Sequence, residues 1–259
     1  MNEQEIINLY NQGFSMRQIA KKIHRSRNTI KIILDKHLIH IRTSAETSKK
    51  YYCNEFYFNK IDHPEKAYWL GFLIADGYIE SKRKYGNQKF GITLAEKDMI
   101  HLQKFNNCLD STYPLLKYIG SGYNPNGIYV KLLITSQQIV NDLKKYGICE
   151  QKTKICKIPP NIPVKYMKDF IRGYIDGDGS IYIDTTTNQL RLSITGTYNL
   201  LYGINQFLGT NNKISFVKND IYELKFGGNK KCLEIFEQLY YKDCLCLERK
   251  YKIISFHLK

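Results

Sequence analysis

The chain has 259 residues and carries 39 Lys and Arg against 24 Asp and Glu, a formal net charge of +15. A hydrophobic fraction of 43%, with 13% aromatic residues, excludes a disordered chain. The sequence has no apolar run of the roughly 18 residues that a membrane span needs, and it begins with polar and acidic residues. We therefore expect a cytoplasmic or otherwise intracellular protein without a membrane partner. Its basic charge favours a polyanionic partner such as nucleic acid.

The first 45 residues predict three short helices. Residues Glu3 to Asn11 have apolar side chains at helical spacing. Ser15 followed by Gln18 is a capping box that begins a second helix, and Ser26 can cap a third helix that runs to about residue 36. Two short helices joined by four residues resemble a helix-turn-helix.

Polar and basic side chains gather where the third helix begins. In a helix-turn-helix this end enters the major groove, and the residue types present contact base edges and phosphates. Residues 1–50 hold ten Lys and Arg against four Asp and Glu, a charge of +6. The alternative is a generic three-helix bundle with a solvated basic face. The predicted DNA contacts of this domain (residues 1–45) are Arg25, Arg27, Asn28, Thr29 and Lys31. Residues 46–62 lose periodicity and predict a linker.

The rest of the chain is an internal repeat. Residues 68–77 recur at 170–179, so that Asp76 and Asp178 are 102 positions apart. The same offset aligns residues 89–93 with 191–195. Residues 128–129 match 221–222 at an offset of 93, and residues 150–155 match 248–253 at 98. We therefore predict two copies, residues 63–160 and 161–259.

Each copy has the same coarse plan. A helix begins near a proline and ends at Asp-Gly, where the glycine is expected to permit a left-handed turn. Two strands, a helix, two further strands and another helix follow. Residues 189–195 alternate polar and apolar, which is typical of a strand with one buried face. The fold class is α+β: two αββαββα repeats that form a saddle, preceded by a small all-α domain.

Residues 69–77 and 171–179 resemble the LAGLIDADG signature of homing endonucleases, and the resemblance covers roughly residues 63–259. The second motif keeps Gly173, Asp176, Asp178 and Gly179. The first departs from the pattern, since Ile74 replaces the inner aspartate and larger residues open the motif. The outer Asp-Gly pair, which carries the chemistry in that family, is intact in both copies.

The resemblance and the chemistry of the residues agree. Helices that pack side by side need small residues where they cross, and Gly71 and Gly173 supply them. The helices then end together and bring Asp76 and Asp178 close to each other. Two such carboxylates stay ionised when a divalent cation lies between them, and phosphodiester hydrolysis uses metals in this way. The resemblance implies Mg²⁺, with Mn²⁺ as a substitute, and the carbonyls of Ala75 and Gly177 as further ligands.

Two lysines match each other at the ends of the copies. Lys152 and Lys250 are predicted to assist catalysis, because a lysine near the scissile phosphate stabilises developing negative charge. The alternative is that both are solvated lysines of a basic protein. Asp176 lies two residues before Asp178 and points to another side of the helix, so we do not count it as a metal ligand.

The polar faces of the strand pairs are predicted to form a positively charged surface along the major groove. Because the copies carry different side chains there, the target is expected to be asymmetric. Lys131 and Lys225 extend this predicted surface. Its other candidates are Lys82, Arg83, Lys84, Gln88 and Lys89 in the first copy, and Gln189, Arg191 and Ser193 in the second.

The sequence thus predicts a monomeric, metal-dependent endonuclease that cuts both strands of a long site in double-stranded DNA. A non-catalytic transcription regulator on the same scaffold is one alternative, and a maturase acting on intron RNA is another. The seven cysteines lack the spacing of a zinc site, so we expect reduced thiols.

Overall fold

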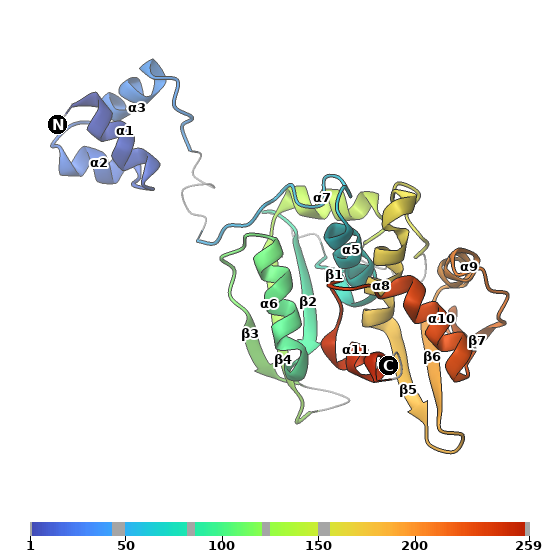
Figure 1. Cartoon of the computed structure of the whole chain (residues 1–259). Helices are drawn as coiled ribbons and strands as arrows, with labels where there is room; N and C mark the ends of the chain where they lie inside the picture. Colours follow the sequence, from blue (N-terminus) through green and yellow to red (C-terminus); the bar gives the residue numbers. More distant parts are fainter. Residues whose placement is uncertain (1, 43–49, 82–85, 121–124, 150–155, 257–259) are drawn as a thin grey trace. The chain divides into compact units, whose positions relative to one another are not determined.

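A computed structural model of the chain describes residues 2–42, 50–81, 86–120, 125–149 and 156–256. The chain divides into two compact units, Met1–Tyr52 and Cys53–Lys259 (Figure 1). Within the described ranges, no helix has both the length and the apolar character needed to cross a membrane.

The first unit is a bundle of three helices, and all three agree with the sequence prediction. Asn2 and Ser15 each form a capping box, and the Ser26 side chain accepts a hydrogen bond from the backbone of Thr29. The core between the helices includes Ile19 and Ile30, both fully buried. The helices are α1 (Glu3–Asn11), α2 (Met16–Lys22) and α3 (Arg27–Lys36).

The bundle continues beyond α3 through Arg42. The Arg42 guanidinium donates to the carbonyl oxygens of Tyr10 (3.0 Å) and Phe14 (2.6 Å) and lies 4.1 Å from the centre of the Tyr10 ring. A cation at these carbonyls complements the negative end of α1. The chain leaving α3 is therefore anchored to the first helix.

The predicted linker 46–62 differs from what the structure shows. Residues 46–49 lie outside the described ranges. From Cys53 onward the chain belongs to the second unit, where Tyr57, Phe58 and Ile61 are buried with exposed fractions of 5%, 0% and 2%. Residues 53–62 lack helical or strand periodicity, which favours a linker, but an irregular segment can still bury large side chains.

The second unit contains one order of elements twice. The first set is α5 (Pro64–Asp76), β1 (Gly77–Ile79), β2 (Lys89–Ala95), α6 (Met99–Cys108), β3 (Leu116–Ile119), β4 (Ile128–Thr135) and α7 (Gln137–Lys145). The second set is α8 (Met167–Asp178), β5 (Gly179–Asp184), β6 (Gln189–Gly196), α9 (Tyr198–Phe207), β7 (Ile214–Lys218), β8 (Ile221–Gly227) and α10 (Asn229–Leu239), and α11 (Glu248–Ser255) follows.

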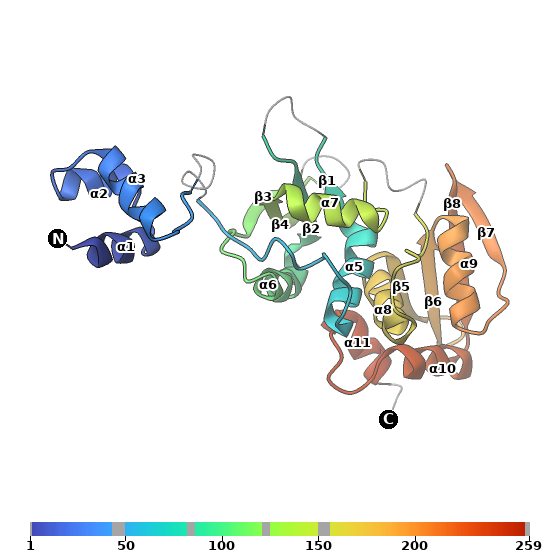
Figure 2. The ribbon, with the colours of Figure 1, turned by 90° about the horizontal axis from the view of Figure 1, so that it is seen from above.

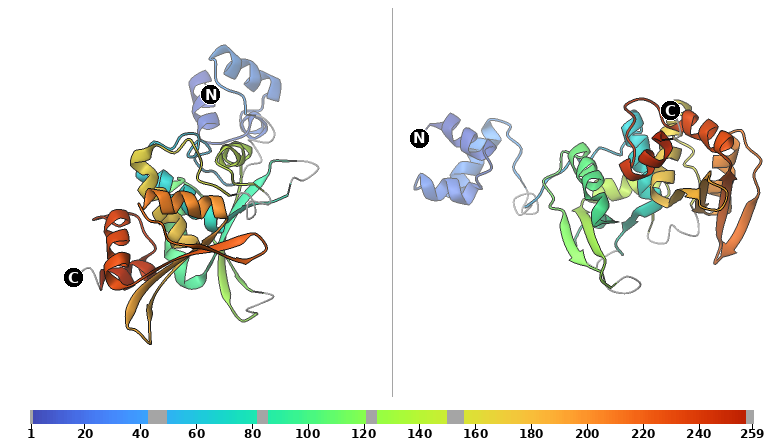
Figure 3. Two further views of the ribbon diagram at one scale, coloured as in Figure 1. Left: turned by 90° about the vertical axis from the view of Figure 1, so that its right-hand side faces the viewer. Right: turned by 60° about the horizontal axis from the view of Figure 1, so that its bottom comes forward.

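Each set forms a four-stranded antiparallel sheet, in the orders β1-β2-β4-β3 and β5-β6-β8-β7. Helices α6 and α7 pack on the first sheet and α9 and α10 on the second. Helices α5 and α8 lie side by side between the sheets (Figure 2), which spread to either side with β3 and β7 at their outer edges (Figure 3). The predicted α+β class with two αββαββα repeats is confirmed.

Strand pairing corrects one predicted alignment. Thr93 lies opposite Lys131 in the first sheet, and Thr195 lies opposite Glu223 in the second. Because Thr93 and Thr195 are 102 positions apart, Lys131 corresponds to Glu223 at an offset of 92 and not 93. Tyr222, predicted to match Tyr129, therefore points to the opposite face of its sheet, since a slip of one residue reverses every side chain of a strand.

Candidate functional site

Helices α5 and α8 cross at two glycines in a reciprocal arrangement. A Cβ atom on Gly71 would lie 2.0 Å from the carbonyl oxygen of Phe170, and one on Gly173 would lie 2.0 Å from that of Tyr68. Each glycine and the carbonyl it faces have counterparts 102 positions away, so the crossing has a pseudo-two-fold axis. The predicted role of Gly71 and Gly173 in the close approach agrees with this geometry.

The two helices end beside each other. A Cβ atom on Gly177 would lie 2.3 Å from the Cβ of Ala75 and 3.3 Å from Oδ2 of Asp76. Asp76 is half-buried and Asp178 is exposed. The carboxylate of Asp76 thus lies against the last turn of α8, in which Asp178 is the final residue.

The glycines that follow these aspartates are extended, which corrects the predicted left-handed turn. Gly77 has φ −74° and ψ 158°, and Gly179 has φ −89° and ψ 151°. Glycine is needed for space: a Cβ atom would lie 2.7 Å from the carbonyl oxygen of Leu73 at Gly77 and 2.4 Å from that of Ile175 at Gly179. Each helix can therefore pass directly into the first strand of its sheet.

A hollow of about 250 Å³ lies next to Asp178 and is lined by Ala75, Tyr174 and Thr197, among others. The Tyr174 hydroxyl donates to the carbonyl oxygen of Thr195 at 2.6 Å. Burial, and then the charge of Asp178, raise the pKa of Tyr174 well above its usual value. Tyr174 is therefore a neutral wall of this hollow and not a base.

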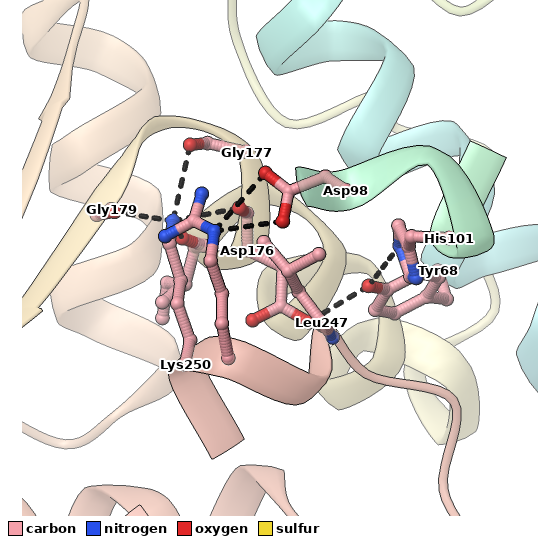
Figure 4. Close-up of polar contacts among 10 residues, drawn as sticks. Tyr68, Asp98, His101, Asp176, Gly177, Gly179, Leu247 and Lys250 are labelled. Carbon is pink, nitrogen blue, oxygen red and sulfur yellow. Dashed lines mark hydrogen bonds and ion pairs between the residues drawn. The ribbon is translucent and has the colours of Figure 1, made fainter. Parts of the chain in front are cut away.

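The side chain of Lys250 packs against the C-terminal end of α8. This side chain is buried (4% exposed). The three N–H bonds of its ammonium group are shared among the carbonyl oxygens of Ile175 (2.9 Å), Asp176 (2.6 Å), Gly177 (3.2 Å) and Gly179 (Figure 4). Burial lowers the pKa of Lys250 to about 8, while the charges of nearby aspartates, Asp76 and Asp178 included, oppose this shift. This ammonium group closes the C-terminal end of a helix. Its predicted action on the scissile phosphate stays a prediction.

Replacing Lys250 by Met is expected to destabilise the second unit by about 2–4 kcal/mol, because the carbonyl oxygens at the end of α8 lose the three N–H donors that they share. For a unit of this size the melting temperature should fall by about 5–15 °C. The folded-state pKa lies below the usual 10.5, so the unfolded chain binds more protons between about pH 8 and 10.5, and stability from this group rises with pH there.

The wild-type advantage over Lys250→Met should therefore grow by up to about 3 kcal/mol between pH 8 and 10.5. Urea unfolding of both proteins at several pH values measures this difference and cancels the titration of tyrosines common to both. An advantage that stays constant with pH would show that the buried ammonium keeps an ordinary pKa.

Asp176 is buried, and three hydrogen-bond donors of the chain surround its carboxylate. Its carboxylate accepts hydrogen bonds from the hydroxyl of Tyr68 at 2.8 Å and from the backbone amide of Leu247 at 2.7 Å (Figure 4). It also accepts one from the hydroxyl of Tyr240 at 2.8 Å. Because the Tyr68 hydroxyl gives its only proton to Asp176, Nε2 of His101 must donate to it (2.9 Å). Burial lowers the pKa of His101 to about 3, so this histidine is neutral.

The predicted DNA contacts differ in how exposed they are. Lys82, Arg83, Lys84 and the predicted catalytic Lys152 lie outside the described residues. In the first unit Thr29 is half-buried, with its hydroxyl 2.9 Å from that of Ser26. Exposed or half-buried on a surface of their unit are Arg25, Arg27, Asn28, Lys31, Lys89, Gln189 and Arg191.

Two predicted contacts are corrected. Gln88 is buried (5% exposed) and bonds to the carbonyl of Glu80 and the ammonium of Lys144. Ser193 is also buried, and its hydroxyl donates to Glu223 at 2.6 Å. Neither side chain is available to a groove in this arrangement, because neighbouring elements satisfy its polar atoms.

The second sheet also carries acidic residues that were not predicted from the sequence. Asp184 lies 3.5 Å from Arg191, and Glu223 lies 2.8 Å from Lys225, on the face turned away from the helices. The alternation of β8 could have revealed Glu223, since it shares a face with Lys225 while Leu224 and Phe226 are buried. The basic surface predicted there is therefore partly neutralised within the protein.

The residues at the helix ends fit a hard divalent cation. Among the described residues no group of three His, Cys, Asp or Glu side chains could hold a metal ion. Mg²⁺, however, is usually bound by one or two carboxylates together with carbonyl oxygens, water and substrate phosphates. Asp76 and Asp178 with the carbonyls of Ala75 and Gly177 are such a donor set, although Lys250 already donates to the Gly177 carbonyl.

Comparison with known proteins identifies the fold. No family model matches the chain. An uncharacterized protein of Methanocaldococcus jannaschii is 26% identical over 199 residues, 74% of this chain. The match covers 66% of that protein, just under two thirds of its length.

Solved structures are similar over about three quarters of the chain. A mutant of I-SmaMI has a TM-score of 0.52 at 14% identity, over 76% of this chain and 91% of that one. I-SmaMI bound to an uncleaved DNA target with calcium ions has a TM-score of 0.50 at 14% identity, over 76% and 90%. The LAGLIDADG homing endonuclease I-LtrWI, bound to its target DNA, has a TM-score of 0.48 at 15% identity, over 79% and 90%. The likeness is one of fold: two sheets that match the LAGLIDADG repeats.

Proposed function

We propose that the chain is a site-specific endonuclease that hydrolyses both strands of a long, asymmetric site in double-stranded DNA with a divalent metal. The observation that carries the proposal is the pair Asp76 and Asp178. Each aspartate is the last residue of its helix, and the two helices pack closely at their crossing glycines. The helix ends lie between the two sheets. A monomer then supplies one carboxylate for each DNA strand.

The metals, when bound, would activate a water molecule and neutralise the leaving oxygen. The chain's own residues hold the helix ends rigid. Lys250 ties the last carbonyls of α8 to α11, and the Gly71–Gly173 crossing keeps α5 and α8 in register. We propose that Lys250 positions Asp178 through these carbonyls. Lys152 keeps its role as a candidate catalytic lysine.

Double-stranded DNA is the proposed partner, along the sheet faces that the helices leave uncovered. Strand alternation places Lys89, Thr93 and Lys131 on this face of the first sheet. I-SmaMI, which shares the fold, has been solved on an uncleaved DNA target with calcium ions. This supports a DNA partner and a divalent cation for the present chain.

We further propose that residues 1–45 are a helix-turn-helix that binds DNA beside the repeats. Arg27, Asn28 and Lys31 are exposed at the first two turns of α3. An amide side chain can pair with adenine, and basic side chains with guanine or phosphate. The segment adds affinity through its charge and sequence preference through α3.

The test is a cleavage assay on two DNA substrates. One is a supercoiled plasmid in which the sequences that flank the gene on either side are joined. The other is a duplex selected for binding from a randomised pool. We expect double-strand cuts at one recurrent sequence with Mg²⁺ or Mn²⁺ and none with EDTA. Specific binding without any nick under these conditions would favour the transcription regulator. Activity confined to intron RNA in a splicing assay would favour the maturase.

Salt dependence tests the first unit. Changing Arg27 and Lys31 to Gln in the full chain removes two phosphate contacts if α3 lies on DNA. The slope of log affinity against log salt should then become less steep by about 1.8. Lys36→Gln is the control, because Lys36 is already held by Glu3 at 2.9 Å. Equal slopes for wild type and the double variant would remove α3 from the interface.

A further inference from the structure

One pair of equivalent positions in the two sheets carries opposite charges. Lys131 in β4 and Glu223 in β8 correspond to each other through strand pairing, since each lies opposite a threonine that is itself repeated. Both side chains stand on the face away from the packing helices, because Val130 and Leu132 in β4 and Leu224 in β8 are buried. The two residues thus hold equivalent places in their strands and carry opposite charges.

Lys131 is held beside an aromatic ring. Its ammonium nitrogen lies 5.4 Å from the centre of the Tyr78 ring, and its side chain is half-buried. An ammonium group in this position can donate to the two major-groove acceptors of guanine. Tyr78 lies on β1, where it pairs with Gly91 of β2. A side chain from a neighbouring strand thus holds the lysine in place.

Glu223 is held in a fixed direction by two donors. The Ser193 hydroxyl donates to Oε1 at 2.6 Å, and the Lys225 ammonium contacts Oε2 at 2.8 Å. These hydrogen bonds, that of Lys225 first, lower the pKa of Glu223, so the side chain is ionised at neutral pH. Lys225 is 67% exposed, and an exposed ion pair of this kind opens easily.

A carboxylate on a surface that binds a polyanion weakens general affinity through repulsion of phosphates. The carboxylate can strengthen binding only where the groove presents a hydrogen-bond donor to it. In the major groove, cytosine offers its amino group without an adjacent acceptor, whereas adenine sets an acceptor beside its amino group. Cytosine is therefore the base that an ionised glutamate at this position accepts best.

We propose that Lys131 and Glu223 are specificity-determining residues that read two base pairs at equal distances from the centre of the target, guanine opposite Lys131 and cytosine opposite Glu223. The inference rests on the proposed DNA-binding function. The equal distances follow from the pseudo-two-fold axis at the Gly71–Gly173 crossing. The pair would break the symmetry of the two half-sites at this position.

Base preference is measured by selection of bound duplexes from a randomised pool, without cleavage, for wild type and for single variants. Glu223→Lys should change the preferred base at one position from cytosine to guanine, and Lys131→Glu should make the opposite change at the mirror position. Glu223→Gln should reduce discrimination there. Each change in relative affinity is expected to be about 5- to 100-fold, the range of one good base contact.

Glu237→Gln is the matched control. It removes the same charge from an exposed position on α10 and should leave the base preference unchanged. Specific binding in which the variants alter no position, or alter positions at unequal distances from the centre, would overturn the inference and leave the proposed function intact. Absence of any specific binding by wild type would overturn both.

Discussion

Substitution of Gly173 by alanine is expected to destabilise the second unit severely. The added methyl carbon would lie 2.0 Å from the carbonyl oxygen of Tyr68 and 2.8 Å from its carbonyl carbon. Both atoms belong to the backbone of α5 and cannot rotate away, so the helices must separate. The fully buried side chains of Tyr68, Trp69 and Phe170 beside the crossing would then lose close packing.

The expected loss for Gly173→Ala exceeds about 4 kcal/mol, the range reserved for severe core defects. In a unit of this size the melting temperature would fall by about 10 °C or more. Gly71→Ala should behave alike, since its methyl carbon would meet the carbonyl oxygen of Phe170, also at 2.0 Å. Thermal and urea unfolding of the full chain, followed by far-UV circular dichroism, measure both variants.

Gly203→Ala is the control for helix propensity. Gly203 lies within α9, and a methyl group there would meet chiefly the terminal carbon of the Ile158 side chain, at 2.7 Å. A side-chain end can rotate, and alanine is the better helix former, so the change should stay within about 1 kcal/mol. If Gly173→Ala melted as high as Gly203→Ala, the close crossing would be wrong.

Features set by neighbours in sequence were predictable. The helix starts at Ser15 and Ser26 follow from a hydroxyl that bonds to the backbone three residues later. The crossing glycines were also predictable, because the repeat places them at the same point of two equivalent helices. For the helix starts, both partners of the hydrogen bond lie within four residues of the sequence. For the glycines, the repeat shows the same residue at the equivalent position of the other helix.

Features set by partners far along the chain were not predictable. The direction of Lys250 depends on α11 packing under the end of α8, which brings residues about 75 positions apart together. The register of β4 and β8 depends on pairing with β2 and β6. An alignment of only two residues in each copy cannot exclude a slip of one residue. The sequence also does not show that Lys144, from α7, donates a hydrogen bond to the side-chain oxygen of Gln88.

Two aspartates on one helix, two positions apart, provide the sharpest test of the site. Asp178→Asn keeps the size of the side chain but removes the charge that the proposed metals need. We expect cleavage to fall by about 1,000-fold or more, a loss of roughly 4 kcal/mol of transition-state stabilisation. Because Asp178 is exposed, the melting temperature should change little, and binding to the selected duplex should persist.

Asp176→Asn makes the same chemical change at the buried junction and should have the opposite effects. An amide cannot accept from Tyr68, Tyr240 and the Leu247 backbone as the carboxylate does, so the fold should lose about 1–3 kcal/mol. Cleavage by the molecules that remain folded should stay within about tenfold of wild type. Plasmid cleavage and thermal unfolding of both variants separate the two roles, because the proposed site requires that activity follow Asp178 while stability follows Asp176. Equal cleavage by Asp178→Asn and wild type would leave Asp178 as an ordinary helix end.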